Sequence, residues 1–109
     1  MKELVEFLQQ HNLVFKSLKE VSVKELGSRK RVQIFVGVDL KGFYADVMVL
    51  EKKSRVLRKE AQELMALHDK LEKYVGSAIR KKYIIIKAPL CSKAKALFEE
   101  YGWRVFHVS

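Results

Sequence analysis

The sequence has one cysteine, one proline and five glycines in 109 residues. A single cysteine cannot form an internal disulfide, so we expect a reducing compartment and a cytoplasmic location. Long hydrophobic runs are also missing, since runs such as residues 84–86 are far too short to span a bilayer. The acidic residues near the N-terminus do not fit a signal peptide. We therefore expect no membrane partner.

Apolar residues make up 49% of the chain, which argues against disorder and predicts one folded domain over residues 1–109. Lysine and arginine total 22 against 13 acids, giving a net charge of +9. A basic excess of this size is typical of nucleic-acid binding, whether the partner is DNA or RNA. An acidic protein partner is the alternative. There is no glycine-rich phosphate loop, so no cofactor is expected.

Hydrophobic spacing predicts an α/β protein with the element order αβββαβαβ. A turn at Lys41-Gly42 joins two strands into an antiparallel hairpin, and alternating helices and strands after it predict parallel strands with helices packed on one mixed sheet. Ser54 and Ser92 are the expected N-caps of the second and third helices. The predicted helices cover residues 1–10, 54–74 and the segment from Ser92 to Tyr101, and the predicted strands cover 13–26, 32–40, 43–50, 83–87 and 103–108.

The topology predicts an anion site. If strands 43–50 and 83–87 are parallel, both end at the same edge of the sheet, and each leads into the N-terminus of a helix. Helix N-termini attract anions and disfavour cations, yet both are rich in lysine and arginine, a conflict that a bound phosphate would relieve. The predicted nucleic-acid-binding residues are those near the two helix starts and a third basic cluster: Lys52, Lys53, Arg55, Lys93, Lys95, Arg29, Lys30 and Arg31.

Asp39 and the later triplet Glu51-Lys52-Lys53 follow the spacing of a nuclease motif, and Glu6 lies on the first predicted helix. With the element order, these residues resemble the restriction-endonuclease-like PD-(D/E)xK nucleases, in particular archaeal Holliday junction resolvases. The resemblance implies Mg²⁺-dependent phosphodiester hydrolysis, with Asp39 and Glu51 holding the metal, Lys53 supporting the attacking water and Glu6 as an extra helix acid.

The hairpin turn decides whether that motif can assemble, because its two carboxylates must lie side by side on neighbouring strands. A turn at Lys41-Gly42 leaves Asp39 beside the tip, with Glu51 on the order of 20 Å away along its strand. A turn at Tyr44-Ala45-Asp46 would instead bring the two acids together. The prediction from the first turn is a nucleic-acid-binding protein without nuclease activity.

A second resemblance rests on Phe35–Asp39, followed by a turn and the segment Ala45–Leu50, which is apolar except for Asp46. This pattern is similar to the opening hairpin of RNase H-like nucleases, which implies that Asp39 would be the first metal ligand. The next acid of that family, expected near the end of a later parallel strand, would fall at Ile86–Pro89, where no acid stands.

The remaining reactive residue types point mainly to structural roles. The three histidines match no metal-ligand spacing, and His68 borders the apolar face of the long helix, which predicts a residue at the edge of the core. Cys91 lies at a helix N-terminus beside Lys93, surroundings that lower the pKa of a thiol. We interpret Cys91 as an ordinary small core residue.

Overall fold

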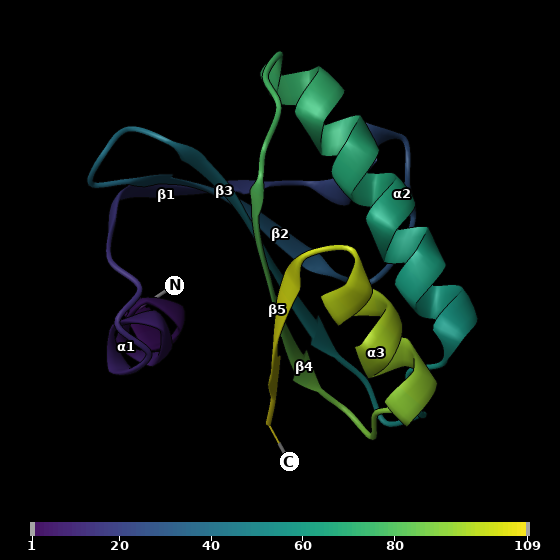
Figure 1. Ribbon diagram of the computed structural model, residues 1–109. Helices are drawn as coiled ribbons and strands as arrows, with labels where there is room; N and C mark the ends of the chain where they lie inside the picture. The colour runs from purple at the N-terminus through teal and green to yellow at the C-terminus, as the bar shows by residue number, and fades with distance from the viewer. Residues whose placement is uncertain (1, 109) are drawn as a thin grey trace.

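The computed structural model of the protein describes residues 2–108, and its helices flank a five-stranded sheet (Figure 1). The order of the elements is the predicted one. Their bounds are α1 Lys2–Gln10, β1 Phe15–Val21, the 3-10 helix Val23–Leu26, β2 Gln33–Asp39, β3 Tyr44–Glu51, α2 Arg58–Val75, β4 Lys81–Lys87, α3 Ser92–Glu100 and β5 Trp103–His107.

The sheet is mixed, with the strand order β1-β2-β3-β4-β5. Pairs β1–β2 and β2–β3 are antiparallel, whereas β3–β4 and β4–β5 are parallel. The helical crossovers through α2 and α3 return the chain in the same direction and make their strands parallel, whereas the tight turn between β2 and β3 reverses it. The predicted fold class, an antiparallel hairpin followed by parallel strands, is confirmed.

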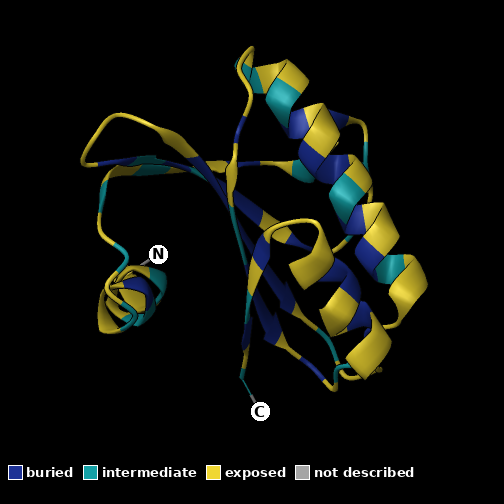
Figure 2. Ribbon diagram, viewed as in Figure 1, coloured by how far each residue is buried: buried dark blue, intermediate teal, exposed yellow. Residues whose placement is uncertain are grey.

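The helices cover both faces of the sheet. Helices α2 and α3 pack on one face, and α1 lies against the other (Figure 1). Strand β4 is therefore covered on both sides: Ile84 and Ile86 belong to the cluster under α2 and α3, whereas Ile85 belongs to the cluster under α1. Strands β2 and β3 are mostly buried, whereas β1 and the outer faces of the helices are largely exposed (Figure 2). Among the described residues, no helix is long and apolar enough to cross a membrane.

Several predicted boundaries are wrong; for example, the strand predicted over residues 83–87 begins at Lys81, and three others have identifiable causes. The first strand ends at Val21, because Ser22 caps a 3-10 helix that Gly27 closes in the left-handed region. Helix α2 starts at Arg58 and not at Ser54, because the preceding segment is pulled into an extended conformation by a bridge between Val56 and Leu90. Ser92 is the first residue of α3, which leaves the N-cap position to Cys91.

Candidate nucleic-acid interface

The carboxyl ends of β3 and β4 lie side by side, since Glu51 is in register with Lys87. The loops that follow are tied together by two backbone hydrogen bonds. The N–H of Val56 donates to the carbonyl of Pro89 at 2.8 Å, and the N–H of Cys91 donates to the carbonyl of Val56 at 3.1 Å. As predicted, the N-termini of α2 and α3 therefore lie at the same edge of the sheet (Figure 1).

The third predicted basic cluster, residues 29–31, comes to the same end of the sheet. It precedes β2, which runs antiparallel to β3, so the start of β2 lies beside the end of β3. Lys30 and Lys52 both form ion pairs with Glu60 on α2. The resulting surface, here called the basic end, comprises Lys52, Lys53, Arg55, Lys93, Lys95, Arg29, Lys30 and Arg31.

Internal ion pairs neutralise only part of the basic end. The ammonium of Lys30 lies 3.0 Å from the Glu60 carboxylate and 3.2 Å from that of Glu63, and Lys52 shares Glu60. The other cations of the basic end are exposed and have no ion-pair partner within residues 2–108. These unpaired cations are Lys53, Arg55, Lys93, Lys95, Arg29 and Arg31.

The charges and backbone N–H groups of the basic end affect the pKa of the Cys91 thiol. The pKa of its thiol is lowered because the backbone N–H groups of Ala94 and Lys93 donate to the sulfur, and the charges of Arg55 and Lys93 add to the effect. Cys91 is partly buried and packs against the core cluster under α2 and α3, as expected of a small core residue, and the predicted lowering of its pKa is confirmed. Surroundings that favour a thiolate also favour other anions, phosphate among them.

The carboxylate of Asp39 binds the backbone of the hairpin turn. Its carboxylate accepts hydrogen bonds from the backbone N–H groups of Lys41 and Phe43, both at 2.9 Å, and from the ammonium of Lys81. Gly42 adopts a left-handed conformation, with φ of 91°. The turn predicted at Lys41-Gly42 is confirmed, and the alternative turn at 44–46 is wrong because those residues belong to β3.

The bonds to Lys81 and to the turn N–H groups lower the pKa of Asp39 to about 2. A depressed pKa means that Asp39 stabilises the fold above its unfolded pKa of about 3.9, and that this contribution is lost as the pH falls toward 2. In urea unfolding at a series of pH values, we expect Asp39→Asn to lose less stability than the wild type between about pH 4 and pH 2. Identical pH profiles of stability for Asp39→Asn and the wild type would contradict the lowered pKa of Asp39.

The nuclease motif is not assembled in the structure. Strand register pairs Val38 with Tyr44 and Gln33 with Val49, so Asp39 lies at one end of the hairpin and Glu51 at the other. Lys53 follows Glu51 in the loop, and both belong to the end opposite Asp39. The structure thus brings Glu51 and Lys53 to the same end but separates both from Asp39.

The β2–β3 pairs under α1 offer no side-by-side carboxylates. Gln33 faces Val49 and Phe35 faces Val47, and neither pair contains an acid. Glu3 and Glu6 are both exposed, and of the two only Glu3 lines the hollow between α1 and the sheet. Within residues 2–108, no group of three or more histidine, cysteine, aspartate or glutamate side chains is placed to hold a metal ion. The residues present therefore do not fit the metal centre that the nuclease resemblance implies.

A second titratable cluster, not anticipated from the sequence, lies beneath α2. Asp46 of β3 is fully buried, and its Oδ2 lies 2.6 Å from Nδ1 of His68, while its Oδ1 has no hydrogen-bond partner. Burial raises the pKa of Asp46, and the contact with His68 offsets part of that rise. The available signal was an acid within the otherwise apolar run of β3. His68 is buried, and its ring packs edge-on against Trp103.

No protein-family model and no curated protein matches the sequence. Solved structures do match. EndoMS in its apo form gives a TM-score of 0.59 at 16% identity, covering 99% of this chain and 45% of that one. An EndoMS–dsDNA complex gives 0.54 at 16% identity, covering 99% and 44%. A repair endonuclease from Pyrococcus abyssi gives 0.56 at 17% identity, covering 100% and 45%.

These similarities concern the fold. The chain spans less than half the length of the proteins that it resembles, and the sequence identities are low. Nearly every residue of this chain is nevertheless covered by each match. The resemblance to nucleases predicted from the order of the elements is confirmed at that level, and the chain has a nuclease-like α/β fold.

Proposed function

We propose that this protein binds nucleic acid through its basic end and does not cleave it. The observation that carries the proposal is the convergence of unpaired cations with the N-termini of α2 and α3. Lys53 and Arg55 precede α2, and Lys93 and Lys95 lie in the first turn of α3. Lys93 and Lys95 oppose the dipole of α3 until an anion binds, and the free backbone N–H groups of α3 and the ammonium groups then contact the same phosphates.

A nucleic acid fits this surface better than an acidic protein. The unpaired cations come from three separate segments at one end of the sheet, a distribution suited to several phosphates of one strand. The similarity to EndoMS, which has been solved with dsDNA, supports the same class of partner. Without side-by-side carboxylates on β2 and β3, binding does not lead to metal-assisted hydrolysis.

The proposal predicts a steep dependence of affinity on salt, because each neutralised phosphate releases counterions. The double change Lys53→Ala and Lys93→Ala is expected to reduce the slope of log K against log salt by about two. A matched control is Lys41→Ala with Arg80→Ala, which removes two exposed, unpaired charges from the opposite end of the sheet. The measurement is fluorescence anisotropy with labelled single-stranded and duplex DNA and RNA at several salt concentrations.

The outcomes separate the alternatives. Equal losses of affinity in both double variants would mean that binding depends on charge spread over the whole surface and not on the basic end. No binding to any nucleic acid at low salt would contradict the proposal and leave an acidic protein as the remaining partner class.

A further inference from the structure

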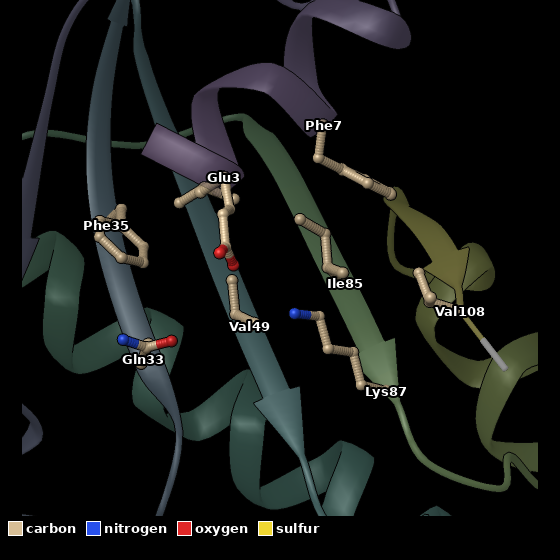
Figure 3. Close-up of a pocket in the computed structure, with 9 residues that line it drawn as sticks. Glu3, Phe7, Gln33, Phe35, Val49, Ile85, Lys87 and Val108 are labelled. Carbon is tan, nitrogen blue, oxygen red and sulfur yellow. The ribbon is translucent and has the colours of Figure 1, made fainter. Parts of the chain in front are cut away.

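A cavity of about 310 Å³ lies between α1 and the face of the sheet opposite α2 and α3 (Figure 3). Its volume falls at the lower end of the range of small-ligand sites. Apolar side chains from α1, from three strands and from the C-terminal segment line most of it: Leu4, Phe7, Phe35, Val49, Ile85 and Val108. The cavity thus offers an apolar, partly aromatic surface of the kind on which a flat ring can pack.

Three polar side chains also line the cavity, and each comes from a different element: Glu3 from α1, Gln33 from β2 and Lys87 from β4. In Figure 3 the carboxylate of Glu3 and the ammonium of Lys87 point toward one another across the floor at Val49. Within the described part of the chain, none of the three side chains forms an ion pair or a side-chain hydrogen bond. A ligand would find an acceptor, a donor and an amide without internal partners.

Lys87 connects this cavity to the basic end. It is the last residue of β4, in register with Glu51, immediately before the loop that leads to α3. An adjoining hollow of about 520 Å³ shares Lys87 and Val108 with the cavity and continues past Pro89. A strand whose phosphates contact the basic end can therefore direct one base toward the cavity.

We propose that the cavity receives one unstacked base of a bound nucleic-acid strand and prefers guanine; this inference rests on the proposed function. The base would pack against the accessible apolar lining of the cavity, to which Leu4, Phe7 and Val49 contribute, a contact available to every base. The edge of guanine presents two adjacent donors, N1–H and the N2 amino group, beside the acceptor O6. Glu3 accepts from the donors, while Lys87 or the amide of Gln33 donates to O6.

The same groups disfavour thymine and uracil. Their edges place carbonyl oxygens on both sides of a single N–H, so at least one carbonyl would face the carboxylate of Glu3. An unpaired carboxylate facing a carbonyl loses both the hydrogen bond and part of its hydration. Cavity selectivity therefore depends on Glu3, whereas general affinity depends on the basic end.

The test compares Glu3→Gln with Glu6→Gln, which removes the same charge from a residue of the same helix that does not line the cavity. Binding is measured for a short thymidine strand, for the same strand with one central guanine, and for one with inosine, which lacks the N2 amino group. The wild type and Glu6→Gln are expected to prefer the guanine strand by about tenfold. Inosine should lose part of that preference, and Glu3→Gln should reduce it to about twofold or less.

Failure of this inference is distinguishable from failure of the proposed function. If the wild type binds the thymidine and guanine strands equally well, with the salt dependence of the basic end intact, the cavity does not receive a base. If Glu3→Gln and Glu6→Gln keep the same guanine preference, Glu3 does not read the base. If no strand binds at all, both the basic end and the cavity are rejected.

Discussion

Replacing His68 with leucine is expected to lower the free energy of unfolding by about 3–5 kcal/mol. The reason is the buried carboxyl group of Asp46, whose Oδ2 lies 2.6 Å from Nδ1 of His68 and whose Oδ1 has no partner. Leucine would fill similar space but would leave the Asp46 side chain without any hydrogen bond in the core. Removing one member of a buried pair is far more damaging than removing both.

The double variant Asp46→Val with His68→Leu is therefore expected to recover most of the loss. Urea unfolding followed by the fluorescence of Trp103, the sole tryptophan, reports directly on this region, because its ring centroid lies 5.5 Å from that of His68. Asp69→Ala, an exposed change next to His68 on α2, is the control and should stay within about 0.5 kcal/mol of the wild type. Additive losses in the double variant would contradict the pairing.

The parallel half of the fold is predictable because its sequence signals agree with one another. The uninterrupted apolar run Ile84–Ile86 indicates a strand covered on both faces, and it is buried on both. The repeated leucines of α2 predict its buried face, and Gly76 ends it in the left-handed conformation. Leu57 belongs to the same apolar spacing but is 54% exposed, since it lies just before the helix.

The errors arise where a tertiary contact overrides a local preference. Ser54 is a good N-cap by residue type, but the bridge between Val56 and Leu90 delays α2 until Arg58. That bridge joins segments that follow different strands, so no local sequence pattern indicates it. The same reasoning applies to Asp46 and His68, whose pairing depends on how α2 packs on β3.

The basic end could be anticipated because topology alone collects the ends of parallel strands and the helices that follow them. The ion pairs that neutralise part of the basic end could not be anticipated. Lys30, Lys52 and Glu60 come together only because β2 runs antiparallel to β3. The cavity under α1 also escaped prediction. Glu3, Gln33 and Lys87 are far apart in the sequence, and none belongs to a recognisable motif.

We expect no cleavage of single-stranded, duplex or branched DNA by the wild type with Mg²⁺ or Mn²⁺. A metal-dependent nuclease needs carboxylates close enough to bind one ion, and the register of β2 and β3 keeps Asp39 and Glu51 at opposite ends of the hairpin. The measurement is a gel assay on labelled substrates over hours. Metal-dependent cleavage that Asp39→Asn or Glu51→Gln abolishes would establish these residues as catalytic and reject this prediction.

The same register identifies where a metal site would have to be built. Gln33 and Val49 face each other across β2 and β3, and Glu51 follows two residues later on the Val49 side of the strand. The triple variant Q33D/V49E/E51K would place an aspartate beside a glutamate, with a lysine in the E-x-K position. We expect Mg²⁺ to stabilise this variant against thermal unfolding by about 1–3 kcal/mol and to leave the wild type unchanged. Q33N/V49Q/E51K is the matched control, because it has similar side-chain shapes without the carboxylates. Equal Mg²⁺ effects in both triple variants would mean that these positions do not form the site, and that the nuclease-like fold of this chain places its strand ends differently from the nuclease motif.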